Sequence, residues 1–231
     1  YPTEEQQRKI AVFLNQKTSE IDSLIEIENQ QIEKLKEYKQ AVITEAVTRG
    51  LDKNVPLKDS GVEWIGKVPN TWESGTIKRV TKKITCGVAA TPEYVEEETG
   101  VLFLSAQNIQ NDKINLSTRR YINNDLYNKI TKNTKPEKGD LLQVRVGASI
   151  GKCAIIDIDD VFGIYVSLSL IKPNELVISK FLYYYLQTSI FRKMSELYID
   201  YAGSQGNLNV EDIKKIYIPI PSIKEQEAIC D

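Results

Sequence analysis

The chain has 231 residues, of which 41% are hydrophobic and 27% are charged, and its formal net charge is −2. This length and composition are typical of one substantial globular core, alone or with an extended element. No run of about 18 apolar residues is present, which argues against a membrane-spanning helix, and the count of zero histidines excludes His-based catalytic triads and His-ligated metal sites.

The three cysteines, Cys86, Cys153 and Cys230, are odd in number and lack the paired spacing of metal ligands. This pattern predicts free thiols in a reducing compartment. We therefore expect a cytoplasmic protein without a structural metal site.

Residues 1–50 are expected to form one long helix, because positions 3–49 contain neither Gly nor Pro. Thr3 with Gln6 has the capping-box pattern at the start, and Gly50 is the expected residue after the end. Apolar side chains recur at heptad spacing, and a seam of this length needs a partner helix, which a helix lying along its own domain would not supply. The seam residues expected to mediate dimerisation are Leu14, Ile21, Ile25, Ile32, Leu35 and Val42.

Residues 51–221 predict an α/β (α+β) globular domain. Short strand-like runs over 101–104, 140–146, 153–156 and 165–171 are separated by turn residues. Residues 179–200 have the apolar spacing of a helix, and a shorter helix is expected at about 208–215. Trp64 and Trp72 are both expected to be core anchors.

Residues 222–231 predict the start of a second helix, with Ser222 and Glu225 in a capping-box pattern. The same pattern, P-[ST]-x-x-[QE]-Q-x-x-I, occurs at residues 2–10 and again at residues 221–229. A period of about 220 residues is too long for a solenoid. It indicates a repeat unit of one helix plus one globular domain.

A search for catalytic chemistry finds no candidate residues. The run Gly147–Lys152 resembles a phosphate-binding loop but has one residue too few between its glycines, and Cys153 stands where Ser or Thr is needed. A tight turn between two strands explains it better. The acidic residues at 157, 159 and 160 are explained by a solvated turn as well as by a metal site. The sequence predicts a binding protein.

Positive charge is concentrated within the globular part. Residues 76–152 contain 13 Lys and Arg against 8 Asp and Glu, a mild footprint for a phosphate-binding surface. Polar and basic side chains there and near residue 205 can contact phosphates or read base edges, although each one alone is explained as well by a solvated surface. The candidate DNA-binding residues are Lys82, Lys83, Gln107, Asn108, Arg119, Arg145, Lys152, Ser204, Gln205 and Asn207.

These motifs together resemble the DNA-specificity subunit of type I restriction–modification systems, over nearly the whole chain. The resemblance rests on IPIPS at 218–222 running into EQEAI, on the helix ending at Gly50, on GDLL at 139–142 before the glycine turn, and on FLYYYL at 181–186. It implies a non-catalytic subunit in which a target-recognition domain reads one half of a bipartite site in double-stranded DNA. The long helices are expected to fix the spacer between the halves.

The resemblance also implies partners. Methyltransferase subunits that bind S-adenosylmethionine and restriction subunits that use ATP and Mg²⁺ are expected, and this chain itself is expected to hold no cofactor. One recognition domain with an uncovered helix seam predicts a half-subunit that forms a homodimer. A different interpretation is a coiled-coil scaffold whose globular domain binds protein rather than DNA; a nuclease or methyltransferase site within the chain is a weaker third interpretation.

Overall fold

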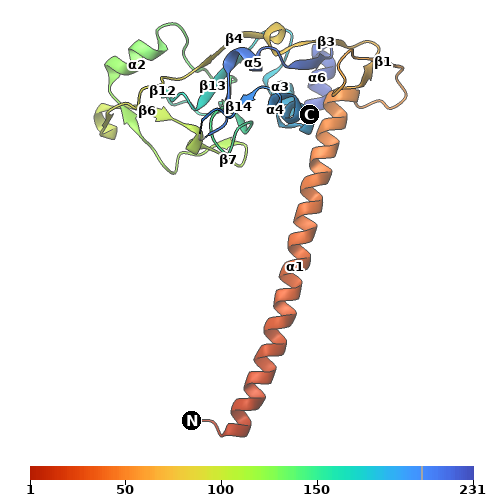
Figure 1. Ribbon diagram of the computed structural model, residues 1–231, viewed down its shortest axis with the longest axis vertical. Helices are drawn as coiled ribbons and strands as arrows, with labels where there is room; N and C mark the ends of the chain where they lie inside the picture. The colour runs from red at the N-terminus through yellow and green to blue at the C-terminus, as the bar shows by residue number, and fades with distance from the viewer. Residues whose placement is uncertain (204) are drawn as a thin grey trace. The chain divides into compact units, whose positions relative to one another are not determined.

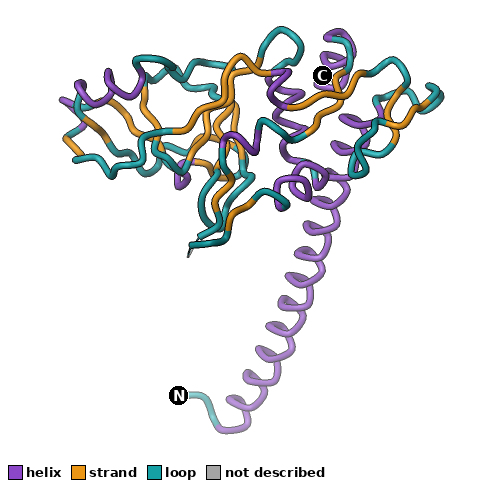
Figure 2. Tube along the Cα trace, turned by 45° about the horizontal axis from the view of Figure 1, so that its top comes forward, coloured by secondary structure: helices purple, strands orange, loops and turns teal. Residues whose placement is uncertain are grey.

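The structure is a computed structural model that describes residues 1–203 and 205–231. The chain divides into two compact units, residues 1–42 and residues 43–231. Figure 2 shows one uninterrupted helix in the first unit and alternating strands, loops and short helices in the second. Within the described residues, no helix combines the length and the apolarity that crossing a membrane requires.

Helix α1 (Glu4–Arg49) has the predicted start and end. The Thr3 amide donates to Gln6 Oε1 at 2.9 Å, and the Gln6 amide donates to Thr3 Oγ1 at 3.4 Å. At the other end the Gly50 amide donates to the Ala46 carbonyl at 3.0 Å, and Gly50 has a φ of 75°, which glycine adopts without strain. The prediction of one helix over this segment is confirmed.

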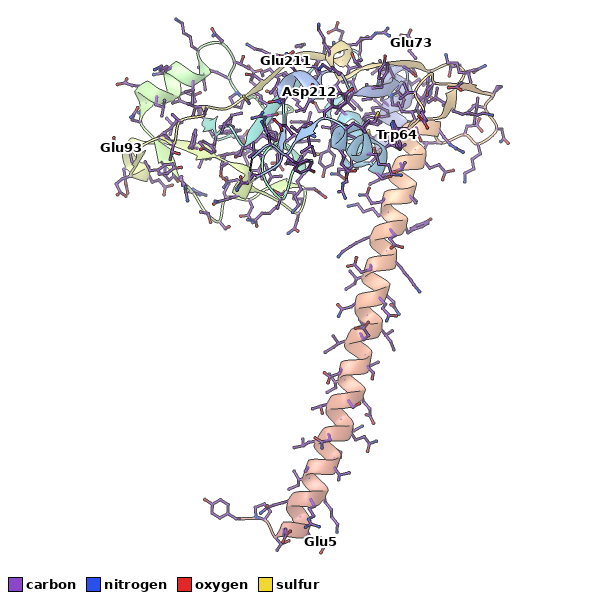
Figure 3. All side chains as sticks on the ribbon, viewed as in Figure 1. Glu5, Trp64, Glu73, Glu93, Glu211 and Asp212 are labelled. Carbon is purple, nitrogen blue, oxygen red and sulfur yellow. The ribbon has the colours of Figure 1, made fainter. Side chains whose placement is uncertain are left out.

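The apolar seam of α1 is exposed to solvent along its length. Leu14, Ile21, Ile25 and Ile32 are between 47% and 54% exposed, and Figure 3 shows side chains projecting from both edges of the helix above Glu5. An apolar stripe that stays in water forfeits the main stabilisation that helices in proteins receive, which is tertiary packing.

A four-stranded antiparallel sheet forms the centre of the second unit, in the strand order β11–β10–β13–β4. Its register places Leu141 opposite Ile171 and Gln143 opposite Ser169. A second sheet, in the order β12–β6–β9–β5, pairs β12 with β6 in parallel and is otherwise antiparallel. The strands of the two sheets are β4 (Thr81–Cys86), β5 (Tyr94–Val95), β6 (Val101–Leu104), β9 (Tyr121–Ile122), β10 (Leu141–Val144), β11 (Cys153–Ile155), β12 (Phe162–Ile164) and β13 (Leu168–Pro173).

Four two-stranded ribbons and several short helices complete this unit, which confirms the predicted α/β class. In Figure 1, β6, β12 and α2 lie at one end of the unit, and α3, α4 and α6 lie at the other. The ribbons pair β1 (Leu57–Asp59) with β2 (Lys67–Pro69), β3 (Glu73–Thr76) with β16 (Tyr217–Ile220), β7 (Ile109–Gln110) with β8 (Lys113–Ile114), and β14 (Ile199–Asp200) with β15 (Asn207–Leu208). The helices are η1 (Ile77–Val80), η2 (Glu97–Thr99), η3 (Ala106–Asn108), α2 (Asn124–Thr131), α3 (Ser179–Gln187), α4 (Ser189–Glu196), α5 (Val210–Ile213) and α6 (Ile223–Cys230).

The central sheet has a hydrophobic core on each face, so its two inner strands, β10 and β13, are buried on both sides over most of their length. Leu141 and Ile171 belong to the core that includes residues of α3 and α4, whereas Leu142 and Leu170 belong to the core shared with β6 and β12. All four side chains are at most 1% exposed. The alternation follows from the period of two along a strand.

The segment 179–200 differs from the prediction of one helix. Thr188 has extended backbone angles and separates α3 from α4, and its Oγ1 accepts a hydrogen bond from the Phe191 amide at 3.1 Å. A threonine hydroxyl at this position caps a new helix, which the apolar spacing alone does not reveal. Trp64 also differs from the prediction, because it is 44% exposed, whereas Trp72 is fully buried as expected.

Helix α6 reproduces the local geometry at the start of α1. Gln226 Nε2 donates to the Pro221 carbonyl at 3.0 Å, as Gln7 Nε2 donates to Pro2 at 2.8 Å. Gln226 is fully buried, and it also donates to the Leu176 carbonyl at 2.9 Å. The internal repeat seen in the sequence therefore corresponds to the same side-chain hydrogen bond at the starts of α1 and α6.

A close backbone approach at Gly87 generates a stability prediction. A Cβ at Gly87 would lie 2.0 Å from the Ile164 carbonyl oxygen, so the strands would have to separate. We expect Gly87→Ala to lower the free energy of unfolding by about 1–3 kcal/mol, the usual cost of overpacking. Denaturant unfolding followed by circular dichroism measures it. Gly203→Ala, where a Cβ would have no atom closer than 4.0 Å, is the control; equal unfolding midpoints for the two variants would contradict the prediction.

Candidate nucleic-acid interface

Two of the predicted clusters, the glycine turn after β10 and the segment before α5, lie side by side. The Leu208 amide donates to the Arg145 carbonyl at 2.8 Å, and the Gly147 amide donates to the Gly206 carbonyl at 3.1 Å. Val146 and Asn207 form an isolated antiparallel bridge. Backbone pairing therefore joins segments that are about 60 residues apart in the sequence into one surface, which we name the paired-loop surface (residues 145–152 and 205–209).

The glycine turn is the tight strand-to-strand turn that its spacing favoured. Gly147 and Gly151 have φ values of 93° and 92°, a region that other residues rarely occupy. The Gly151 amide donates to the Val144 carbonyl at 2.9 Å, which closes the turn between β10 and β11. No helix follows the turn, so it lacks the helix N-terminus that a phosphate loop uses. Lys152 is exposed at its end.

Arg145 is buried rather than exposed, with 6% of its surface accessible. Its guanidinium donates four hydrogen bonds. The acceptors are the carbonyls of Leu208 at 3.0 Å and Val166 at 3.1 Å and the side-chain oxygens of Asn207 at 2.7 Å and Asn209 at 3.2 Å. With its donors directed into the protein, this side chain is not placed to reach a base. The sequence predicted a side chain exposed for direct DNA contact, and the structure instead buries it among hydrogen-bond acceptors.

The other candidates of the paired-loop surface divide by exposure. Gln205 is exposed, whereas Asn207 is half-buried and its amide contacts Arg145 and Asn209. Ser204, also a candidate from the sequence, lies outside the described residues. Gln205 thus retains an accessible carboxamide, which both donates and accepts hydrogen bonds.

The segment around η3 adjoins the paired-loop surface through Ser167. The Ala106 amide donates to Ser167 Oγ at 3.0 Å, and the Arg145 amide donates to the Ser167 carbonyl at 2.9 Å. Gln107 is exposed there. Asn108 is only 5% exposed and uses its side chain to hold Ser105, Asn115 and Thr118 in place, so its role is structural.

The structure does not bring Lys82 and Lys83 to the paired-loop surface. Both are exposed near the start of β4, where Lys83 is opposite Lys172, whereas the paired-loop surface lies beyond the other end of the sheet, where Cys86 is opposite Ser169. Arg119 is exposed and forms an ion pair with Glu97 at 3.3 Å. No described contact joins Arg119 to the paired-loop surface.

Sequence reasoning missed one residue of this surface, Asn209, and one residue beside it, Tyr201. Asn209 shares the Arg145 guanidinium with Asn207, and Tyr201, which is 68% exposed, lies against Gly206, where a Cβ would be 3.0 Å from the tyrosine ring. An aromatic residue within the polar stretch 200–207 was the available signal for Tyr201. Asn209 offered none, because its partner is 64 residues away.

Acidic side chains next to this surface are neutralised locally. Figure 3 labels Glu211 and Asp212 on α5, directly after Asn209. Glu211 pairs with Lys214 at 2.6 Å and Asp212 pairs with Lys215 at 2.7 Å. Each pair lies at the surface with one half-buried member, and the two lysines offset negative charge that would otherwise repel a polyanion.

Potential metal ligands and two of the three thiols bear on whether this chain could catalyse a reaction. The part of the chain that the structure describes contains no cluster of three or more carboxylate, Cys or His side chains that could hold a metal ion. Burial raises the pKa of the Cys153 thiol far above its ordinary range, and burial also raises the pKa of Cys230. What the surface offers is hydrogen bonding by Gln205 and positive charge at Lys152.

Comparison with known proteins shows which class of domain has this architecture. The model of the "Type I restriction modification DNA specificity domain" matches residues 69–231. The MjaVIII type I restriction enzyme specificity subunit of Methanocaldococcus jannaschii is 28% identical over the whole chain and 53% of its own length. The EcoBI specificity subunit of Escherichia coli is 26% identical over 97% of this chain and 48% of its own. The chain therefore spans about half the length of these relatives.

Solved structures agree on the fold. The HsdS subunit from Thermoanaerobacter tengcongensis superposes with a TM-score of 0.59 at 17% identity, over 99% of this chain and 50% of that one. A chain from a study of assembly and conformational transition in the type I R-M system gives a TM-score of 0.60 at 19% identity, with the same coverage. The fold shared with these structures is an α/β domain that follows a long helix in the chain. The chain belongs to the type I restriction–modification DNA specificity domain family.

The burial of the thiols generates a reactivity prediction. We expect a maleimide at neutral pH to modify half-buried Cys86 well before Cys153 or Cys230, because both buried thiols are shielded and stay protonated. Mass spectrometry of proteolytic peptides along a labelling time course gives the order, with the urea-unfolded protein as the control in which all three react alike. Early labelling of Cys153 in the folded protein would contradict its burial.

Proposed function

We propose that this chain is the DNA-recognition part of a type I specificity subunit and reads one half of a bipartite target in double-stranded DNA. The observation that carries the proposal is the paired-loop surface. Exposed Gln205 and Lys152 lie on this surface. Its two segments are flanked by β10, β11 and α5, and they are paired with each other. The domain that carries them belongs to a family named for DNA specificity.

Each exposed side chain has a suitable task in this proposal. A carboxamide such as that of Gln205 makes paired hydrogen bonds to adenine in the major groove. An ammonium such as that of Lys152 contacts phosphates and fixes the register without reading sequence. Gln107 and Arg119 supply further groups of both kinds, and the surplus of 13 basic over 8 acidic residues in 76–152 favours approach to the duplex.

The remaining steps belong to partners. The relatives that match this chain are specificity subunits of restriction enzymes. We assign methylation to methyltransferase subunits that hold S-adenosylmethionine and cleavage to restriction subunits that use ATP and Mg²⁺. This chain would act in the cytoplasm as the non-catalytic adaptor that brings them to the target. Its lack of histidine accords with a protein that performs no proton transfer of its own.

The long helix is assigned to self-association. The seam residues of α1 are exposed along a helix of 46 residues, and two such seams covering each other would bury both stripes. Two copies related by a two-fold axis would present two identical reading domains. The target of such a dimer would be palindromic about a spacer, and the length of α1 would set that spacer.

Removing Lys152 tests the phosphate contact. We expect Lys152→Ala to bind a random-sequence duplex several-fold more weakly. We also expect the slope of log affinity against log salt to become shallower by about one, because one fewer counterion is released. Fluorescence anisotropy over a salt series measures both quantities. Lys58→Ala, which removes an exposed lysine of β1, is the matched control; an unchanged slope for Lys152→Ala would remove this residue from the interface.

Charges placed in the seam test the dimer. We expect wild type to sediment as a dimer at micromolar concentration and Ile25→Glu with Ile32→Glu to sediment as a monomer, because two buried carboxylates per helix oppose association. Ile27→Glu is the control, since Ile27 is 50% exposed like its neighbours but does not lie at a seam position. Analytical ultracentrifugation measures the oligomeric state. A wild-type monomer would refute the dimer proposal and leave the proposed DNA recognition unaffected.

A further inference from the structure

Arg145, in the first segment of the paired-loop surface, is bonded to the second segment and to the neighbouring loop at residues 166–167. Its backbone pairs with Ser167 and Leu208, while its guanidinium reaches Val166, Asn207 and Asn209. The planar fork of a guanidinium holds several acceptors at fixed angles, which an ammonium cannot do. The buried guanidinium therefore adds side-chain hydrogen bonds to the backbone pairing that joins the two segments.

The acceptors around Arg145 are all neutral. They are two carbonyl oxygens and two amide oxygens, and among the described residues no carboxylate forms an ion pair with this guanidinium. A buried charge held only by dipoles is costly, and proteins usually pair it. The positive charge of Arg145 is thus held by hydrogen bonds to neutral acceptors alone, at the start of the segment that ends at exposed Lys152.

We infer that Arg145 is a positioning residue for DNA recognition: it sets the separation and orientation of the glycine turn and the 205–209 segment, and so governs sequence discrimination more than affinity. The inference rests on the proposed function. Phosphate attraction tolerates small displacements because it is long-ranged and carries no sequence information. Hydrogen bonds to base edges require the reading side chains at fixed places.

Substitutions separate geometry from charge. Arg145→Lys keeps the charge but loses the fork, and Arg145→Met loses both. Asn209→Ala removes one acceptor and leaves the arginine. The matched control for stability is Asp140→Asn, which removes the negative charge of the largely buried ion pair between Asp140 and Lys172 (2.5 Å), near the opposite end of β10.

The experiment first selects the preferred site from a randomised duplex library with the wild-type full chain and its methyltransferase partner. The affinity ratio between that site and random duplex is then measured for each variant, together with the melting temperature. We expect Arg145→Lys to lower the ratio at least about tenfold while affinity for random duplex stays within about twofold. Asn209→Ala should lower the ratio to a smaller extent. Arg145→Met should lose both discrimination and part of the random-duplex affinity.

The outcomes are distinguishable. A ratio preserved in Arg145→Lys, or an equal fall of the ratio in Asp140→Asn at a similar melting temperature, would overturn the inference and leave DNA recognition standing. If both Arg145 variants fail to fold, Asn209→Ala decides, and an unchanged ratio there overturns the inference. A wild-type chain that selects no site refutes the proposed function itself, before any variant is compared.

Discussion

The burial of strand β10 on both faces is the constraint on which the rest of the globular unit depends. Leu141 faces the core under α3, and Leu142 and Val144 face the core shared with the second sheet. A strand fixed from both sides has little freedom to shift, since close-packed interiors resist even small displacements. Residues directly after Val144 inherit that rigidity. The segment directly after β10 is therefore a suitable place for a surface that must keep its shape.

Loops that extend from this rigid strand are held in place by polar side chains that form hydrogen bonds inside the protein. Arg145, Asn207 and Asn108 all resemble solvent-exposed contact residues in the sequence, yet each holds loops together in the structure. Irregular segments lack the ladder bonds of sheets and helices, so their backbone carbonyls need side-chain donors. The polar residues in and around the paired-loop surface thus divide into those exposed to solvent, such as Gln205, and those that hold the loops in place, such as Arg145 and Asn108.

The sequence was sufficient for the parts governed by local rules. The long helix, its caps, the α/β class and the glycine turn follow from spacing, capping residues and the conformational freedom of glycine. The break at Thr188 was missed because a single hydroxyl cap competes with continuous apolar periodicity. The pairing of the turn with the 205–209 segment depends on contacts across some 60 residues. Burial of Arg145 depends on the same contacts, and no single-sequence pattern encodes them.

The duplicated junction has a consequence for how such proteins diversify. The bond from Gln7 to Pro2 forms in full exposure, while its counterpart from Gln226 to Pro221 forms in full burial. The geometry of the junction is therefore encoded within a few adjacent residues and does not require the globular unit beside it. Such a segment forms the same junction in two different structural surroundings. Recombination between two such segments would exchange the intervening globular unit while leaving the helix start correctly formed.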